Sequence, residues 1–326
     1  MTSHSIRLFI GAALFAVLSL SASAQTQAGA IKAVRIEGDV QKLLADGTQV
    51  VVIEGALITE KDTLVTGAKS SVVLVFMNGS TVHVGATTRL SIDEFAMDPF
   101  SEDIEPSKLQ KEPSVSRTSL NVAYGEVVGN VKKLAKGSSY NVHTPVGAAG
   151  IRGTTFSVKL VPVTLPGGQT TYNITLSTAE GLVLFTAVAP AGVTPTTTEV
   201  SAGTAVNASI EVTVSPAGTA TATPTATATV APVGTISPEA AATITAVANF
   251  VAAAVQNVVI TQVQAQQAAT EAAAKTATPA EVPSTTPAAA PVVNQTEAVK
   301  AAVTPPPEIT TPNPVNTDLR SVSGPG

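Results

Sequence analysis

Apolar and polar residues alternate along several short segments, and this period of two constrains the fold more than any other feature. Residues 81–84 read Thr-Val-His-Val, and the same alternation recurs over 154–160 and 171–176. Successive side chains of a strand point to opposite faces of a sheet, so each segment would direct one apolar row inward. The pattern therefore predicts β-strands in all three places.

Glycine-containing turns separate these segments, and Glu180-Gly181 is expected to form one such turn between strands near 170–177 and 182–188. Asn78-Gly79 stands between the apolar run 72–77 and the alternating run 80–84. Asn-Gly between two apolar strands favours a tight hairpin, because both turn positions need a positive φ. Turn residues spaced roughly ten apart favour an all-β domain over a βαβ fold. We expect an all-β fold, a short β-solenoid or a sandwich-like domain with hairpins.

Composition changes along the chain. Residues 215–326 hold 14 of the 22 prolines but only nine of the 41 charged residues. Thr/Ala/Pro tracts lack the large apolar surface that offsets ordering entropy. The expected parts of the chain are a signal peptide (1–24), a β-domain (25–213, with halves at about 30–97 and 118–213 around a loop, 98–117), a Thr/Ala/Pro linker (214–236), one Ala/Val-rich helix (237–275) and a disordered Pro-rich tail (276–326).

The N-terminus has the order of a secretory signal. Arg7 precedes the uncharged run 8–20, and small residues follow up to Ala24. Thirteen apolar residues are too few to span a bilayer core, which takes about 20. We expect cleavage after Ala24 and export to the periplasm or the extracellular space, with an uncleaved anchor as the alternative.

One segment of the C-terminal part has helical character. Ser237-Pro238-Glu239 supplies an N-cap, a proline at the first helical position and an acidic first turn. The apolar residues that follow at a 3-4-3-4 spacing are Ile244, Val247, Val251, Ala254 and Val258. This helix has three interpretations: it docks or self-associates, it stands isolated, or it spans a membrane. Membrane contact is expected only through 238–275.

Several classes of function are disfavoured. The chain has no cysteine, which excludes disulfides and Cys-ligated metals. Its net charge of −5 argues against nucleic-acid binding. His83 and His143 lie in expected strands without a Ser/Asp partner motif, and the acidic loop around Asp98 to Glu105 fits no calcium repeat. We expect no catalytic residues, no metal and no cofactor, and hence not an enzyme.

Motifs spread over about 30–210 resemble the FecR domain. The most specific piece is residues 141–156, Asn-Val-His-Thr-Pro-Val-Gly-Ala-Ala-Gly-Ile-Arg-Gly-Thr-Thr-Phe. The resemblance implies an extracytoplasmic all-β domain that senses or binds a partner. In the founding regulators a cytoplasmic tail controls a sigma factor, but about seven residues precede the apolar run here, so we do not expect direct sigma-factor control. The candidate partner-binding or structural residues are Thr144, Pro145, Gly150, Arg152, Gly153, Thr154 and Phe156.

Arg152 has two interpretations. Its guanidinium offers five donors in a rigid fork, which suits either a structural brace or a partner contact. As a brace it would bond carbonyls or a carboxylate such as Glu126 or Glu180. As a contact it would meet a protein or a cell-envelope component. The alternative to such a binding or sensing module is a structural envelope or matrix protein that forms a homo-oligomer through its C-terminal helix.

Overall fold

The computed structural model describes residues 26–44, 46–166, 169–190, 192–213 and 228–276. Seventeen strands, one short 3-10 helix and two α-helices make up these residues. The strands before residue 98 are β1 (Gln27–Ala28), β2 (Ile31–Glu37), β3 (Val40–Leu43), β4 (Gln49–Val51), β5 (Leu57–Ile58), β6 (Thr63–Thr66), β7 (Ser71–Phe76), β8 (Thr81–Val84) and β9 (Arg89–Met97). The later elements are η1 (Pro106–Lys108), β10 (Ser116–Asn130), β11 (Ser139–Thr144), β12 (Gly147–Thr164), β13 (Gln169–Ala187), β14 (Thr197–Ser201), β15 (Thr204–Thr213), β16 (Thr229–Val230), β17 (Gly234–Thr235), α1 (Pro238–Ala254) and α2 (Gln262–Thr276).

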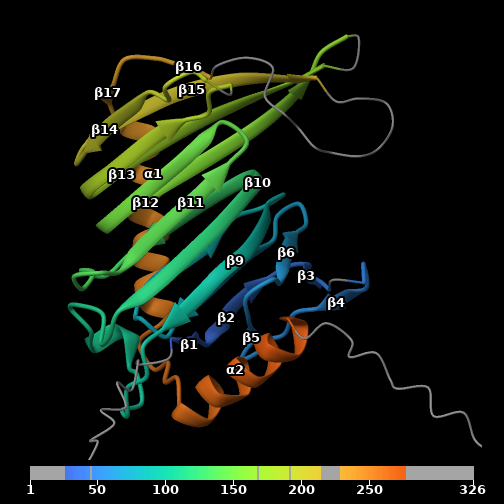
Figure 1. Ribbon diagram of the computed structural model, residues 1–326, viewed down its shortest axis with the longest axis vertical. Helices are drawn as coiled ribbons and strands as arrows, with labels where there is room; N and C mark the ends of the chain where they lie inside the picture. Colours follow the sequence, from blue (N-terminus) through green and yellow to red (C-terminus); the bar gives the residue numbers. More distant parts are fainter. Residues whose placement is uncertain (1–25, 45, 167–168, 191, 214–227, 277–326) are drawn as a thin grey trace, which may run out of the picture. The chain divides into compact units, whose positions relative to one another are not determined.

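The strands form one open sheet, so the expected all-β class is confirmed (Figure 1). Strand β10 joins its two parts: the first half of β10 pairs with β9 and β11, and the second half pairs with β8 and β12. The sheet continues from β12 through β13 to β14 and β15. Within the described pairings only β10 and β11 run parallel. The expected halves are therefore continuous through the hydrogen bonds of one long strand.

The predicted hairpin is confirmed at β7 and β8. These strands pair antiparallel around Asn78-Gly79, but only Gly79 of this pair has a positive φ, of +83°, so the expected positive φ at both turn positions is not found. The expected strands 170–177 and 182–188 are instead a single strand, β13, which passes through residues 180–181 without a turn. The reason is that β13 pairs with β12 on both sides of this point, with only a local shift of register.

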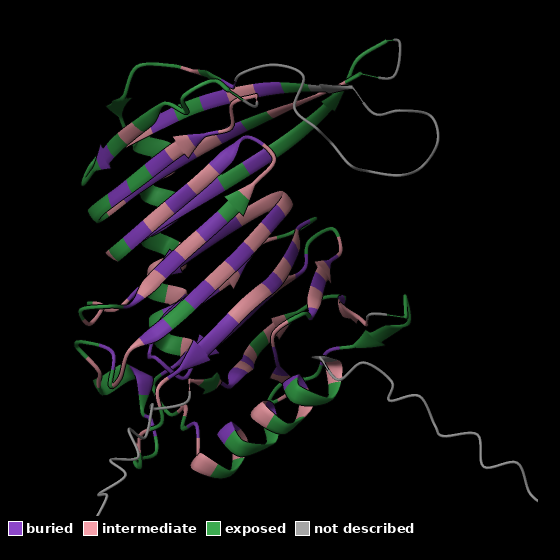
Figure 2. Ribbon diagram, in the orientation of Figure 1, coloured by how far each residue is buried: buried purple, intermediate pink, exposed green. Residues whose placement is uncertain are grey.

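The core lies on the inward face of the sheet, and burial alternates along the strands (Figure 2). Among the bulkiest fully buried side chains are Tyr140, Phe76, Phe95 and Phe156. The Phe76 and Phe95 rings meet edge to face with centroids 5.0 Å apart. Burial raises the pKa of the Tyr140 hydroxyl. Four of the eleven aromatic residues of this chain are thus grouped where strands from both halves meet.

The loop predicted at 98–117 contains a buried carboxylate. Glu112 accepts hydrogen bonds from Ser116 Oγ (2.6 Å), from the Ala135 backbone N–H and from the Ser138 hydroxyl. These bonds satisfy a charge that would otherwise be costly to bury. The loop is therefore fixed to the turn before β11, although it lacks long regular elements.

Two helices stand where one was expected over 237–275. Ser237 caps α1 by accepting a hydrogen bond from Ala240 N (3.2 Å). After α1 ends, Ile260 forms an antiparallel bridge with Ile104, with two backbone hydrogen bonds of 2.9 Å. Residues 258–260 are all β-branched, which lowers their helix propensity and favours this extended bridge. Over the residues that the structure describes, neither helix has the length and apolar character of a membrane span.

Helix α1 packs on the sheet with the apolar stripe that the spacing indicated. Ile244 and Val251 are buried, and Val247, Ala254 and Val258 pack against the core. Phe250 lies under the Arg35 guanidinium, which is 5.3 Å from the ring centroid. The same ring meets His83 edge to face at 5.8 Å. The interpretation as a docking helix therefore describes α1 within this chain.

Helix α2 is fixed to the N-terminal part of the sheet by a buried ion pair. Asp62, which is 1% exposed, lies 2.8 Å from Lys275 Nζ and 3.5 Å from Lys42 Nζ. Both lysines also approach Glu271, at 3.2 and 3.5 Å. Thr59 donates its backbone N–H and its hydroxyl to Asp62. Helix α2, close to the end of the described chain, is thus held against residues close to its beginning.

The remaining sequence predictions fall largely outside the described residues. This applies to the signal peptide (1–24), to the linker up to residue 227 and to the tail after residue 276. The described end of the linker is partly regular, since β16 and β17 both pair with β15.

Candidate functional site

The Thr-Pro-Val-Gly part of the singled-out motif forms the turn between β11 and β12. The Thr144 hydroxyl accepts hydrogen bonds from the backbone N–H groups of Val146 and Gly147, both at 3.2 Å. It also donates to Gly147 O at 2.8 Å. A threonine whose hydroxyl bonds its own backbone stabilises a turn of this kind. Thr144 and Pro145 therefore have a local structural role.

The Arg-Gly-Thr part forms a β-bulge against β13. The register of β12 on β13 shifts between Arg152 and Thr155, and Gly153 has a φ of +60°. On the neighbouring strand Gly181 has a φ of +83°, and a Cβ there would lie 2.6 Å from Gly153 O. Two glycines in close backbone contact thus allow the bulge, which re-aims the side chains beside it.

Thr154 and Phe156 anchor the bulge in the core. Thr154 is 1% exposed and its hydroxyl bonds Arg152 O and Leu182 O, both at 3.1 Å. Phe156 is fully buried, and its ring covers Gly129 so closely that a Cβ on Gly129 would lie 2.4 Å from it. These residues are required for packing and are not available to a partner.

Arg152 is the exposed member of the motif. Its guanidinium makes no hydrogen bond or ion pair with any residue that the structure describes. Glu126 is instead 3.9 Å from Lys159 Nζ, and Glu180 accepts a hydrogen bond from Thr155 Oγ1 at 3.3 Å. The brace through Glu126 or Glu180 is therefore not formed. Gly150 lines the same groove as Arg152, and a Cβ added there would make only ordinary contacts, the nearest to Asn141 Oδ1 at 3.7 Å.

Two surface hollows flank Arg152. One is lined by Lys132, Lys133 and Arg152, with Glu180 as the sole carboxylate among the described lining residues. The other is a groove of ≈ 230 Å³ on the outer side of β11–β13, lined by Arg152, Asn141 and Gly150 together with two leucines. We call the groove and its arginine the Arg152 surface, and its outward side chains are Arg152, Asn141, Leu182 and Leu184.

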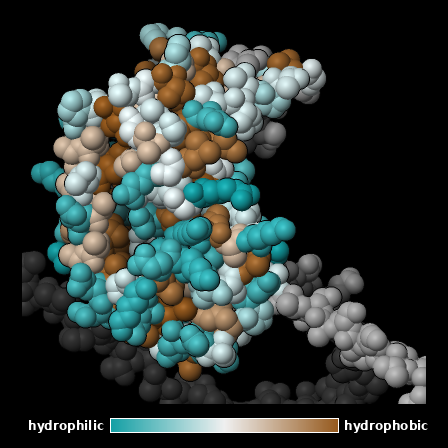
Figure 3. Space-filling view, turned by 90° about the vertical axis from the view of Figure 1, so that its left-hand side faces the viewer, coloured by the Kyte–Doolittle hydropathy of each residue, from teal (hydrophilic) through white to brown (hydrophobic). Residues whose placement is uncertain are grey.

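The two leucines of the Arg152 surface were not singled out from the sequence. Leu182 and Leu184 are each 40% exposed, whereas Val183 and Phe185 between and after them are buried. The run 182–185 is apolar on both faces, so its alternation is hidden in the sequence. Figure 3 shows that hydrophobic side chains emerge among hydrophilic ones over one side of the molecule. Exposed apolar residues alone therefore do not single out a site, whereas their position beside an unpaired arginine does.

The histidines do not form a catalytic arrangement. His83 is half-buried against Phe250, and burial lowers its pKa while Glu37 partly opposes this shift. His143 is exposed on β11. In the ranges that the structure describes, no three His, Asp or Glu side chains are grouped as a metal site.

The geometry defines a β-domain whose signature motif supports an outward arginine. Residues 62–184 match the family model of the FecR protein. The resemblance to the FecR domain that the motifs indicated is therefore confirmed over these residues, a shorter range than the expected 30–210.

Two crystal structures are similar to this chain, and both are described as a "putative anti-sigma factor from Parabacteroides distasonis". They are 15% and 14% identical to this chain, and each match covers 44% of this chain and 53% of that chain with a TM-score of 0.29. The chain thus spans about half the length of these proteins. No curated protein matches the chain.

Proposed function

We propose that the chain is an exported, non-enzymatic FecR-domain protein that acts as a binding or sensing module of the cell envelope. One observation carries this proposal: the motif holds Arg152 outward and exposed, with no partner among the described residues, while Thr154 and Phe156 of the same motif are buried. An arginine in such a position is suited to contact an acidic group of a partner.

Charge and shape around Arg152 support a partner of defined chemistry. Lys132 and Lys133 border the neighbouring hollow, so cations outnumber the single carboxylate of Glu180 there. The groove on the other side offers Leu182 and Leu184. Arginine is among the residues enriched at interface hot spots. The proposed partner is a protein or another envelope component that presents an acidic group next to an apolar one.

Export rests on the sequence of residues 1–24, which has the order of a cleaved signal. It would place the FecR domain in the periplasm or outside the cell. The alternative, a structural protein that oligomerises through its C-terminal helix, has less support, because Ile244 and Val251 of α1 are already buried within the chain.

Site-specific photo-crosslinking in living cells tests the proposal. A photoreactive amino acid replaces Leu182 in the full chain, and the matched control carries it at Val193, which is similarly exposed but lies in the connection after β13 and does not line the groove. We expect an envelope component to be crosslinked at 182 and not at 193. Equal crosslinking at both positions, or recovery of the unprocessed protein from the cytoplasm only, would contradict the proposal.

A further inference from the structure

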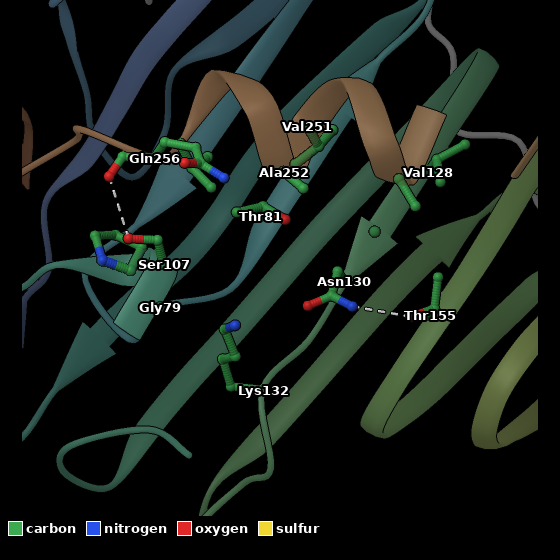
Figure 4. A pocket seen from close by; sticks show the side chains of 14 residues that line it. Gly79, Thr81, Ser107, Val128, Asn130, Lys132, Thr155, Val251, Ala252 and Gln256 are labelled. Atoms are coloured by element: carbon green, nitrogen blue, oxygen red, sulfur yellow. Dashed lines mark hydrogen bonds between the residues drawn. The ribbon is translucent and has the colours of Figure 1, made fainter. Parts of the chain in front are cut away.

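A third hollow lies between α1 and the sheet, away from the groove of the Arg152 surface (Figure 4). Its volume is ≈ 240 Å³, whereas a single water needs roughly 10–15 Å³. The helix forms one wall of this cavity and strands β8 and β10 form the other. A small organic molecule in it would contact both elements at once.

One part of the cavity is apolar. Helix α1 contributes Val251, Ala252 and Val255, and β10 contributes Val128 from the opposite side. Because residue 252 is alanine, its side chain leaves room in the cavity that a larger side chain at this position would fill. This part is suited to a short hydrocarbon group.

The other part is polar and carries one unpaired cation. Lys132 is half-buried, and its ammonium has neither an ion pair nor a hydrogen bond among the described residues. Burial lowers the pKa of this ammonium group. Asn130 lies beside it, and its amide already donates to Thr155 Oγ1 at 2.9 Å. Among the described lining residues there is no carboxylate.

Two electrostatic effects determine the sign and the size of the charge that a ligand can carry in this cavity. A partly buried cation without a partner is unfavourable, so an anion beside Lys132 would be stabilised. The cavity also reaches Val255, the C-cap of α1, and a helix C-terminus carries partial negative charge. A single carboxylate on the Lys132 side satisfies both conditions better than a doubly charged phosphate.

We propose that this cavity is a binding site for a small amphipathic carboxylate, with its carboxylate on Lys132 and its hydrocarbon chain against Val251 and Val255. The cavity shares Asn130 and Lys132 with the hollow beside Arg152, but it shares no lining residue with the groove of the Arg152 surface, so the inference goes beyond the proposed function. Because the ligand contacts both α1 and the sheet, its binding energy would favour the docked position of α1.

Titration with hexanoate tests this inference on the full mature chain. Calorimetry gives the affinity, and hexan-1-ol serves as a neutral probe of similar length. We expect saturable binding of hexanoate that Lys132→Met weakens by at least about tenfold, the loss that follows from removing a charge-assisted hydrogen bond. The matched control, Lys133→Met, changes an exposed neighbour and should leave the affinity unchanged.

A cavity-filling variant and a methyl spectrum locate the site. Ala252→Phe should abolish hexanoate binding, and hexanoate should shift the methyl resonances of Val128, Val251 and Val255 in the unmodified chain. The inference is overturned if the unmodified chain shows no saturable binding or no such shifts. Equal affinity for hexan-1-ol, or undiminished binding by a folded Lys132→Met variant, would overturn it as well.

Discussion

Gly181 provides a direct test of the β-bulge that supports Arg152. The residue has a φ of +83°, and an added Cβ would lie 2.6 Å from Gly153 O and 2.9 Å from Thr154 Oγ1. Replacing it with alanine therefore adds two costs, one from the backbone conformation and one from the collision. Neither neighbouring atom belongs to the end of a flexible side chain, so the strands themselves would have to move.

Gly203 is the matched control. Its φ of +75° is similar, but a Cβ there would meet nothing within 4 Å. Both alanine variants bear a conformational cost of about 1–3 kcal/mol, reduced by about 0.4–1 kcal/mol because alanine restricts the unfolded chain. Only Gly181→Ala adds an overpacking cost of about 1–3 kcal/mol.

Urea unfolding of both variants measures the free energy of unfolding. We expect Gly181→Ala to lower it by about 1–3 kcal/mol more than Gly203→Ala, with an unchanged m-value. Equal losses in the two variants would refute the close approach of Gly181 to Gly153. The bulge would then have no steric basis at this position.

Three further predictions concern the C-terminal helices. Phe250→Ala should lower the free energy of unfolding by about 1–3 kcal/mol, because it removes the ring that packs under Arg35. This loss is smaller than for a fully buried ring, since Phe250 is only partly buried. A free energy of unfolding equal to that of the unmodified protein would contradict the prediction. Lys275→Met should lower the free energy of unfolding by about 1–3 kcal/mol. This is less than the roughly 3–5 kcal/mol lost when a buried pair is wholly broken, because Lys42 still faces Asp62. Hydrogen exchange of the α2 amides should become faster, and unchanged exchange would contradict the role of the ion pair. Because burial lowers the pKa of His83, the unfolded chain binds a proton more readily, so stability should fall as the pH drops below about 6.5 and level off below the folded pKa. His83→Gln should flatten this part of the curve, and an unaltered pH profile would exclude His83 as its source.

Local patterns in the sequence predicted the β elements well where their causes are local. Asn78-Gly79 favours a turn whatever the surrounding fold, because glycine readily adopts a positive φ, and the hairpin of β7 and β8 forms there with a positive φ at Gly79. The turn predicted at Glu180-Gly181 was wrong because the same signal, a glycine with positive φ, also serves a bulge. Whether a turn or a bulge forms depends on the pairing of β13 with β12, and this pairing joins residues that are far apart in the sequence.

The helices show the same limit. Ser237 and Pro238 mark the start of α1 correctly, because capping is local. The break before Ile260 depends on its bridge to Ile104, about 150 residues earlier in the chain. The pairing of Asp62 with Lys275 also joins residues that no spacing rule connects.

The candidate site was predicted as a motif but not as a surface. The sequence singled out Arg152, and the structure leaves it exposed, without a hydrogen bond or ion pair to any residue it describes. Leu182 and Leu184 could not be assigned to the outer face, because Val183 and Phe185 around them are equally apolar. Which row faces outward is decided by the register of β13 on β12.

The central claim is that Arg152 contacts a partner and does not brace the fold. The direct measurement compares the affinity of Arg152→Ala and of the unmodified chain for the envelope component crosslinked at position 182, together with the free energy of unfolding of both proteins. We predict a change in stability within about 0.5 kcal/mol, as for other exposed positions, and a loss of affinity of at least about tenfold. Unchanged affinity, or a loss of stability above about 2 kcal/mol with affinity retained, would contradict the claim.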